Sequence, residues 1–393
     1  MLIFIYIMLA KNETQHLKSD IEEKLKVIPD ININISKENV NDSELHSPLT
    51  SLRDVDESFT FAINKPKRLV DLQNRHTYGS NFNNIKIENN RIIKENINLY
   101  GYSKIIKEIN YYKYIAPTIF NIYFPKILNI KFNIGEKLKF SPDIKVACIE
   151  MEYLENYEEL YKIFYKIDKS KQLNILTKIF TILNTIHKKS EYNINQIIYT
   201  RDLMIETKDK LITRFKEIEH IINEYRHIKY VNNIKIKTFD EILSIIEVNV
   251  LEYIKSKSNY TYSLIHGDCQ FSNILIHKNN DIKFIDPRGY FGNTMLFGIP
   301  EYDIAKVFFA LSGYDHFDNQ IIEELNIIND NINIKLESYD FDSVYNLFPL
   351  YSKNFIIILM ITIWLGNAHI YKSNINKCIT SYFIGLLQAK LLL

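Results

Sequence analysis

Hydrophobic and polar residues alternate with a period of two in several short runs between about residues 78 and 154, the pattern of half-buried β-strands. Two of these runs, NNIKIENN and RIIKE, predict a β-hairpin. Ile85 and Ile87 share one face of the first strand, and Asn89 and Asn90 supply the turn. A further run, VACIEMEYL, predicts another strand at the end of this region. The pattern therefore predicts a small sheet in this part of the chain.

A helical period appears next to the strands and then dominates. In SKIIKEINYYKYI the residues Ile105, Ile109 and Tyr112 fall on one stripe, which predicts a helix beside the small sheet. After about residue 155, apolar residues recur at steps of three and four, which predicts helices over residues 173–189, 206–225 and 239–256. A β-rich island follows at 262–286, and helices are expected from about 301 to the end.

This order of elements predicts an α+β protein with two lobes, a small β-rich N-lobe and a large, mainly helical C-lobe. The expected boundaries are an extension over residues 1–70, an N-lobe over 71–155 and a C-lobe over 156–393. The extension is polar and has no clear period.

An apolar stretch, FIIILMITIWLGNA, occupies residues 355–368. It is shorter than the roughly 20 residues of a membrane span and predicts a buried core helix.

The first ten residues, MLIFIYIMLA, are apolar, but no basic residues precede them and the run is too short to cross a bilayer. A buried strand or helix start is the favoured interpretation, with a degenerate signal peptide as the alternative. No membrane segment is predicted.

Charge and cysteine content narrow the class of partners. The 393 residues contain 48 basic and 47 acidic side chains, a net charge of +1, which gives no electrostatic reason to expect nucleic acid or an anionic membrane as partner. The three cysteines are widely spaced and form no CxxC pair, which argues against a disulfide framework or a zinc site. These features predict a cytoplasmic protein, and they leave the oligomeric state open.

The β-rich island carries the candidate chemistry. In YSLIHGDCQFSNILIHKNNDIKFIDPRG, a strand leads to Asp268, a short loop leads to Asn273, and a hairpin brings Asp286 back to the same end. Mg²⁺ in phosphoryl-transfer sites takes one or two protein oxygens beside the substrate phosphates, which Asn273 and Asp286 can supply. Asp268 is then free to accept a proton from a hydroxyl. The island predicts a cation site next to a general base.

At these residues the chain resembles the aminoglycoside phosphotransferase and choline kinase family, which has the protein-kinase-like fold. HGDCQFSN and IDPRG look like its catalytic and metal-binding loops. The resemblance implies that Asp268 is the base and that Asn273 and Asp286 hold the metal ions, while His266 shapes the loop. PEYDIAKVF looks like the family's helix-opening segment, in which Asp303 would buttress the catalytic loop. DPRG and EYDIAK look most like members linked with surface-polysaccharide genes.

The resemblance extends upstream and covers about residues 78–390. It implies that Lys94 pairs with the α- and β-phosphates of the nucleotide and that Glu108 is its ion-pair partner. TYGSNFNNIKI would be the loop and hairpin over the nucleotide, although Gly79 is its one glycine. IEMEYL would be the hinge, whose backbone holds adenine at Glu152, Tyr153 and Leu154. The implied cofactors are ATP (or GTP) and Mg²⁺.

The main candidates also have plainer interpretations. Asp268, Asn273 and Asp286 are residue types that commonly cap turns. For Lys94 the alternative is a solvated strand lysine, and for Glu108 it is an exposed helix residue.

The supporting candidates leave alternatives open as well. Asp303 can interact with the helix dipole alone, and Arg288 is either a phosphate contact or a surface arginine. His187 and His266 are expected to be hydrogen-bonded structural histidines. Cys269 is expected to be a small filler, since nothing nearby marks it as a nucleophile.

Ten acidic residues fall between 301 and 342, against the two bases Lys306 and Lys335. If this stretch flanks the acceptor, its negative field favours a cationic or polyhydroxylated acceptor. The alternative is a solvated acidic surface. The acidic residues are Glu301, Asp303, Asp315, Asp318, Glu323, Glu324, Asp330, Glu337, Asp340 and Asp342.

The sequence thus predicts an ATP-dependent phosphotransferase that acts on a hydroxyl of a small, sugar-like or amino-alcohol acceptor. One rival is a catalytically silent nucleotide-binding module, which the poor glycine loop favours and the intact Asp268, Asn273 and Asp286 oppose. A protein kinase is the other rival. Its HRD, DFG and APE segments have no counterpart in the sequence.

Overall fold

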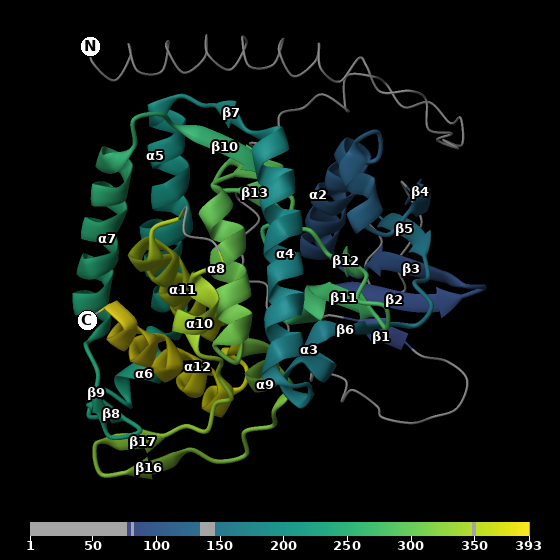
Figure 1. The fold of residues 1–393 in the computed structure, drawn as a ribbon. Coiled ribbons are helices and arrows are strands. Elements are labelled where there is room, and N and C mark those ends of the chain that lie inside the picture. Colours follow the sequence, from purple (N-terminus) through teal and green to yellow (C-terminus); the bar gives the residue numbers. More distant parts are fainter. Residues whose placement is uncertain (1–76, 80–81, 134–145, 348–350, 393) are drawn as a thin grey trace.

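The computed structural model describes residues 77–79, 82–133, 146–347 and 351–392, which form two lobes (Figure 1). The sheet of the small lobe lies on the right of Figure 1, and the helices of the large lobe lie on the left. The predicted α+β arrangement, with a small β-rich lobe and a large, mainly helical lobe, is confirmed. The extension predicted for residues 1–70, with the apolar run at its start, lies outside the described residues.

The small lobe is a five-stranded antiparallel sheet in the order β1-β2-β3-β5-β4, with one long helix. Its elements are β1 (Thr77–Gly79), β2 (Asn83–Glu88), β3 (Arg91–Asn96), α2 (Leu99–Ile115), η2 (Ile119–Tyr123), β4 (Ile127–Asn133) and β5 (Val146–Glu152).

The predicted β2–β3 hairpin is present, with Ile85 opposite Lys94 and Ile87 opposite Ile92. Asn89 and Asn90 have φ of 48° and 62°, so both turn residues lie in the left-handed region. This is the backbone of a tight hairpin turn, and asparagine tolerates it better than most residues. The turn therefore fixes the register that places Lys94 on its strand.

The large lobe begins with helices and short strands and runs through the β-rich island. In order these are β6 (Tyr157–Glu159), α3 (Leu160–Ile163), η3 (Phe164–Lys166), α4 (Lys169–Ser190), β7 (Tyr192–Asn193), α5 (Gln196–Met204), the π-helical turn η4 (Ile205–Asp209), α6 (Lys210–Asn223), β8 (Tyr230–Val231), β9 (Ile234–Lys235), α7 (Phe239–Ser256), β10 (Thr261–Leu264), η5 (Phe271–Asn273), β11 (Ile274–His277) and β12 (Ile282–Phe284).

The remaining elements are β13 (Tyr290–Phe291), β14 (Thr294–Met295), β15 (Phe297–Gly298), α8 (Pro300–Leu311), α9 (Tyr314–Asn319), β16 (Asn326–Ile328), β17 (Asn331–Asn333), α10 (Phe341–Tyr345), α11 (Lys353–Ala368), η6 (His369–Tyr371), α12 (Ile375–Gln388) and η7 (Ala389–Leu392). Capping residues begin several of the helices. Asp168 accepts a hydrogen bond from the Lys171 amide at the start of α4, and Thr238 and Glu241 form a capping box at α7.

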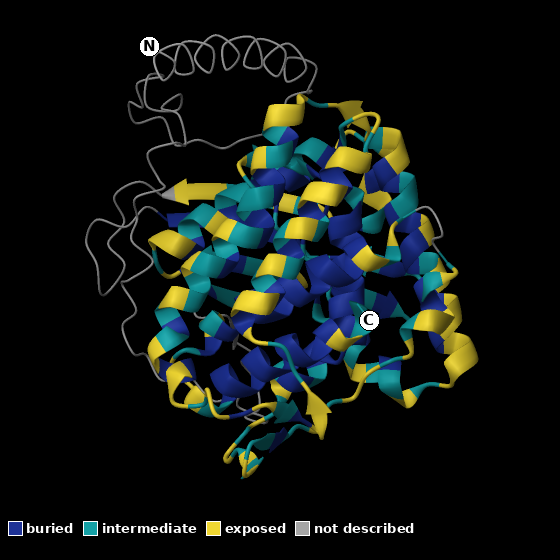
Figure 2. Ribbon diagram, turned by 90° about the vertical axis from the view of Figure 1, so that its left-hand side faces the viewer, coloured by how far each residue is buried: buried dark blue, intermediate teal, exposed yellow. Residues whose placement is uncertain are grey.

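The predicted apolar core helix is α11, which is buried from Phe355 to Ala368 and packs against α6, α7, α8 and α12. Figure 2 shows the buried residues gathered inside the helical lobe, with exposed residues on its outer helices. The segment Lys353–Tyr371 is long and apolar enough to span a membrane, yet 83% of its most apolar window is buried within the protein. It is a core helix, as predicted.

The expectation of helices from 301 to the end is wrong at one place. Residues 326–333 form the hairpin β16–β17, which joins β8 and β9 in a four-stranded sheet. Ile327 and Ile332 face each other across this hairpin, and Asn329 takes a left-handed φ of 55° in its turn. The strands have three residues each, which is too short for a period of two to be seen in the sequence.

Candidate active site

The β-rich island folds so that its polar residues meet at one end. Strand β10 ends at Leu264, and the chain then passes through Asp268 to Asn273, where β11 begins. Strand β12 runs antiparallel to β11, and the Ile285 amide donates a hydrogen bond to the Asn273 carbonyl over 3.0 Å. Asp286 is the next residue, so it lies beside Asn273.

Asp268 and Asn273 are in direct contact. The Asn273 side-chain nitrogen donates to Asp268 Oδ2 over 3.0 Å and to the Asp268 carbonyl over 2.9 Å. These two bonds fix the carboxylate of Asp268 and the loop that carries it. The predicted base and the predicted metal ligand therefore share one rigid loop.

Lys306, on α8, is the other partner of Asp268, with its ammonium 2.8 Å from Oδ1. Burial alone would raise the pKa of Asp268, but Lys306 outweighs it and holds this pKa below its usual value. Asp268 is therefore a carboxylate at neutral pH. Lys306 did not enter the predicted site, although it lies one helical turn after Asp303 and so faces the same way.

Asp303, on α8, holds the backbone of the catalytic loop. Its Oδ2 accepts hydrogen bonds from the His266 amide and from His187 Nε2, both at 2.9 Å, and its Oδ1 accepts one from the Gly267 amide at 2.6 Å. The side chain is fully buried. Asp303 therefore holds the backbone at His266 and Gly267.

His266 has a hydrogen bond at each ring nitrogen. Nδ1 accepts from the Asp268 amide at 3.2 Å and Nε2 lies 2.9 Å from the Ile285 carbonyl, so the neutral ring with its proton on Nε2 satisfies both contacts. Burial lowers the pKa of His266, which favours this neutral form. Gly267 has a φ of 78°, and a Cβ there would lie 2.9 Å from the Cβ of Arg288.

Asp315, on α9, holds the other half of the loop. Its two oxygens accept hydrogen bonds from the amides of Phe271 and Ser272, each at 3.0 Å. Burial raises the pKa of this carboxyl to about 6. The sequence grouped Asp315 with the acidic residues expected to flank the acceptor; in the structure its carboxylate binds the backbone of the catalytic loop.

Lys94 joins the small lobe to the island. Its ammonium lies 2.7 Å from Glu108 Oε2 on α2 and 2.8 Å from Asp286 Oδ1. Lys94 and Glu108 are 5% and 3% exposed, so neither is the solvated residue that the plainer interpretation predicts. Asp286 has a left-handed φ of 56°, an uncommon backbone that recurs at functional sites.

Charge is unbalanced in this cluster of one ammonium and two carboxylates. Burial disfavours the Lys94 charge, but Asp286 and Glu108 outweigh it and hold the pKa of Lys94 above its usual value. Burial, aided by Asp286, raises the pKa of Glu108 to about 7. Glu108 Oε1 is buried and has no hydrogen-bond partner. This cluster is thus short of positive charge.

The donor set suits Mg²⁺ at a phosphate. Asn273 Oδ1 and Asp286 Oδ2 accept no hydrogen bond from the described residues, and the Asp286 side chain is 40% exposed. Two protein oxygens with phosphate oxygens and water are a usual Mg²⁺ environment. No group of three or more His, Cys, Asp or Glu side chains within the described ranges could hold a metal ion on its own. The residues therefore fit a metal that arrives with a nucleotide.

The predicted hinge follows β5. The Glu152 amide donates to the Lys126 carbonyl at 3.0 Å and the Tyr153 amide to the Asn90 carbonyl at 3.2 Å. The Leu154 amide has no backbone acceptor among the described residues. Of the three predicted hinge amides, it is therefore the one that is available as a hydrogen-bond donor to a ligand. Gly79 ends β1 opposite Asn84, and the two residues after it lie outside the described residues.

Arg288 is not the surface arginine of the plainer interpretation. Its guanidinium makes a two-point ion pair with Glu206, at 2.9 and 2.5 Å, and donates to the Tyr302 hydroxyl at 2.8 Å. Glu206 lies in the π-helical turn between α5 and α6, a feature that often accompanies functional sites. The sequence does not reveal this pair because 82 residues separate its members.

Two hollows open near these elements. The smaller lies between η4–α6, α8 and α11. One of its lining residues, Lys306, contacts Asp268. The full lining is Glu206, Lys210, Arg214, Tyr302, Lys306, Thr362, Ile363 and Asn367. The acidic residues of 301–342 do not line it. From that stretch the cavity receives Tyr302 and Lys306, so its lining does not carry the predicted negative field. The cationic or polyhydroxylated acceptor stays a prediction.

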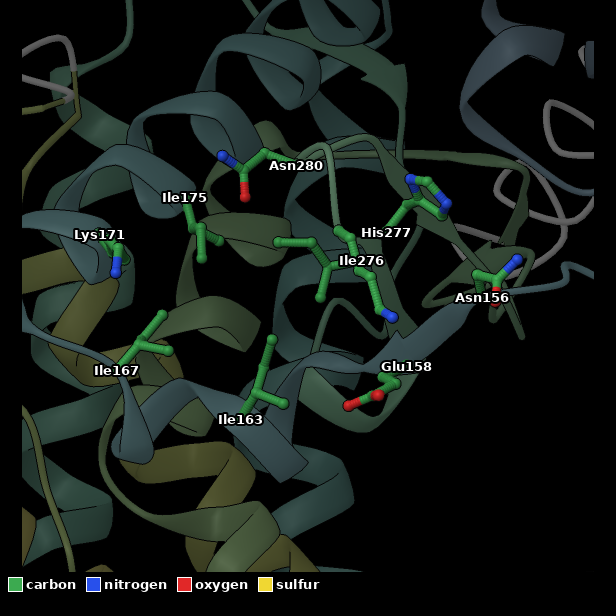
Figure 3. Close-up of a pocket in the computed structure, with 10 residues that line it drawn as sticks. Asn156, Glu158, Ile163, Ile167, Lys171, Ile175, Ile276, His277 and Asn280 are labelled. Carbon is green, nitrogen blue, oxygen red and sulfur yellow. The ribbon is translucent and has the colours of Figure 1, made fainter.

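The larger hollow, about 180 Å³, lies over the β6–β11 edge and α4 (Figure 3). Ile163, Ile167, Ile175 and Ile276 form its apolar part, with polar side chains such as Asn280 around it. No residue of the predicted site lines it. It is a surface hollow apart from the catalytic loop.

Comparison with known proteins gives matches among solved structures alone: no protein-family model and no curated protein matches the chain. A choline kinase from Cryptosporidium parvum Iowa II is 13% identical, covering 81% of this chain and 89% of that one, with a TM-score of 0.47. Choline kinase LicA from Streptococcus pneumoniae is 12% identical, covering 81% and 94%, with a TM-score of 0.46. ADP-bound aminoglycoside phosphotransferase APH(2'')-Ib is 13% identical, covering 82% and 96%, with a TM-score of 0.44.

These names are those of the two groups that the motifs resemble. With identities this low, the likeness does not extend to activity or substrate.

Proposed function

We propose that this chain, similar in fold to choline kinases and aminoglycoside phosphotransferases, is a phosphotransferase that moves the γ-phosphate of ATP (or GTP) to a hydroxyl of a small molecule. The observation that carries the proposal is the convergence of Asp268, Asn273 and Asp286. Asp268 contacts Asn273 at 3.0 Å, and Asp286 follows the residue that is hydrogen-bonded to Asn273. A base and two metal ligands are the parts that phosphoryl transfer requires.

In this proposal the nucleotide lies between the lobes. The backbone of Glu152 to Leu154, with the Leu154 amide available, holds the base, and the strand ending at Gly79 leads into the loop over the phosphates. Lys94 binds the α- and β-phosphates, and Glu108 positions Lys94. Asn273 and Asp286 hold Mg²⁺, which neutralises phosphate charge when bound.

Asp268 accepts the proton of the acceptor hydroxyl as the new O–P bond forms and the bond between the γ-phosphorus and the β-phosphate oxygen breaks. The products are a phosphate ester and a nucleoside diphosphate. Lys306 keeps Asp268 ionised, and Asp303, His266 and Asp315 keep its loop in place. Arg288 supports the loop rather than the phosphate. Its backbone amide donates to the His266 carbonyl, and its guanidinium pairs with Glu206.

The test is ATP consumption by the purified chain across a library of hydroxyl-bearing metabolites, with Asp268→Asn as the blank. Asp268→Asn keeps the shape and loses the base, so we expect turnover to fall by roughly 10²- to 10⁴-fold while Mg²⁺-dependent nucleotide binding stays. Turnover by Asp268→Asn at the wild-type rate would refute the proposal. Nucleotide binding without turnover of any metabolite would favour the catalytically silent module instead.

A further inference from the structure

The cavity beside Asp268 is formed by charged and polar side chains from separate helices. Lys210 and Arg214 come from α6, Lys306 from α8 and Asn367 from α11, while Glu206 is the one carboxylate in its lining. Three basic side chains thus face one carboxylate. Burial, with Arg288 nearby, lowers the pKa of Lys210 to about 7, so Lys210 is only partly protonated at neutral pH. Because Lys306 also contacts Asp268 at 2.8 Å, the cavity adjoins the base that would receive the acceptor's proton.

The one carboxylate is already neutralised. Glu206 pairs with Arg288 at 2.5 Å and with Lys210 at 3.0 Å, and it also accepts a hydrogen bond from the Gly292 amide at 3.1 Å. Arg214 donates to the Gly366 carbonyl at 3.2 Å, and no carboxylate of the described residues pairs with it. The half-buried Arg214 guanidinium therefore lacks a counter-ion, which is costly unless a ligand supplies one.

Two cationic side chains lie over the ring of Tyr290, on β13. The Arg288 guanidinium lies 3.9 Å from the centre of its ring, and the Lys107 ammonium lies 4.0 Å away. Burial would raise the pKa of Tyr290, but Arg288 and Lys210 outweigh it and lower this pKa to about 7. The region between α2, α6 and the catalytic loop is thus positive.

A second, independent feature of the cavity is Asn367. Its side chain is 8% exposed and lines the cavity, yet the amide makes no hydrogen bond with the described residues. Its oxygen and nitrogen are not among the fully buried, unpaired atoms of the described residues, so they are open to the cavity. Two N–H donors and one oxygen are therefore available to a group inside the cavity.

From this arrangement we infer that the acceptor carries an anionic group, a carboxylate or a phosphate, in addition to the hydroxyl that is phosphorylated. The anionic group binds between Arg214, Lys210 and Asn367, and the hydroxyl lies outside, at Asp268. The enclosed space is about 30 Å³, which is room for one small group and not for a whole sugar. The rest of the acceptor therefore extends into the cleft.

This inference rests on the proposed function, because it names the substrate class of the same site. It also removes one of the two acceptor classes that the sequence left open, the amino-alcohols. An amino-alcohol would place its ammonium among Lys210, Arg214 and Lys306, where like charges repel it. A sugar acid or sugar phosphate fits the charge and the size together.

The first experiment tests the anion site without requiring turnover. Sulfate is titrated by calorimetry into the full chain saturated with Mg²⁺ and a non-hydrolysable ATP analogue, at constant ionic strength. We expect sulfate to bind the wild type, and Lys210→Gln combined with Arg214→Gln to weaken it by roughly tenfold or more, the loss of at least one charge-assisted hydrogen bond. Equal affinities, or no binding by the wild type, would overturn the inference.

The matched control is Lys188→Gln with Lys189→Gln, which removes the same charge from exposed positions in the last turn of α4. It should bind sulfate like the wild type. If this control loses affinity as much as the cavity variant, the effect is one of net charge and the inference fails. Bound nucleotide in each variant shows that the fold is retained.

The second experiment compares turnover of glucose, glucuronate, glucose 6-phosphate and glucosamine, which share a carbon skeleton and differ in charge. Faster turnover of either acid supports the inference and distinguishes carboxylate from phosphate, whereas faster turnover of glucosamine or glucose overturns it. If none is a substrate, the sulfate titration decides. Sulfate binding by a chain that does not bind ATP would instead sink the proposed function and leave an anion site.

Discussion

The two sides of the candidate cleft are built with opposite charge imbalances. On the nucleotide side, one ammonium, Lys94, faces the carboxylates of Glu108 and Asp286. On the acceptor side, the carboxylates of Glu206 and Asp268 face four basic side chains, Lys210, Arg214, Arg288 and Lys306. Burial and Arg288 lower the pKa of Lys210 to about 7, so three of the four are fully charged at neutral pH. A buried cluster that is not neutral favours a ligand of the missing sign. The first side thus suits a metal cation and the second an anion.

The comparison also separates two kinds of carboxylate. Burial disfavours the charge of both Glu108 and Asp268, yet the pKa of Glu108 rises to about 7 while that of Asp268 falls below its usual value. The difference lies in their neighbours. Glu108 shares its lysine with a second carboxylate, whereas Asp268 has Lys306 to itself. A base that must be ionised lies where the cations are in excess.

The largest effect is expected from removing the nucleotide-side carboxylate that faces the metal. Asp286→Ala should lower phosphoryl transfer by about 10³-fold or more, because the Lewis-acid contribution of the metal is worth several kcal/mol. The measurement is single-turnover transfer over a Mg²⁺ titration. Glu88→Ala, at an exposed position on β2, is the control and should match the wild type. Transfer by Asp286→Ala with an unchanged Mg²⁺ dependence would show that Asp286 does not hold the metal ion.

A smaller effect, with a defined sign, is expected on the acceptor side. Lys306→Met removes the ammonium that lowers the pKa of Asp268, and burial, which raises this pKa, then dominates. The acid limb of the pH–rate profile should move to higher pH, so that activity is lost more at low pH than at high pH. A loss due to structure alone would scale activity at every pH. Lys306→Arg keeps the charge and should keep the position of the limb.

The local parts of this fold and site could be predicted from the sequence. The Asn89–Asn90 turn is specified by residues adjacent in the chain, and so is the approach of Asp268 to Asn273. The motif that the chain shares with a kinase family fixes which strand ends meet.

The acceptor side could not be predicted, because its charges come from distant helices. Glu206 meets Arg288 across 82 residues, and the π-helical turn that aims Glu206 has no sequence signature of its own. The acidic stretch 301–342 shows the same limit. Counting charges along the chain does not show that Asp303 and Asp315 turn inward to backbone amides while Lys306 turns to the base.

The smallest effect is expected at Asp315, which supports the catalytic loop without belonging to either charge cluster. Its folded-state pKa, about 6, is above the ordinary 3.8. A carboxyl with a raised pKa stabilises the fold most at low pH, and this contribution is lost as pH rises from about 4 through 6. Asp315→Asn should therefore flatten that part of the pH dependence of the unfolding free energy, as measured by denaturant titration.

Asp315→Asn should also cost about 1–3 kcal/mol at every pH, since one of the amides of Phe271 and Ser272 then faces an N–H group instead of an acceptor. Asp340→Asn is a control at an exposed cap, where the side chain accepts a single hydrogen bond from Asp342 and asparagine caps equally well. If Asp315→Asn leaves the slope between pH 4 and 6 as steep as in the wild type, Asp315 is ionised throughout. The hydrogen bonds from the Phe271 and Ser272 amides, which favour the ionised form, would then outweigh burial in setting the pKa of Asp315.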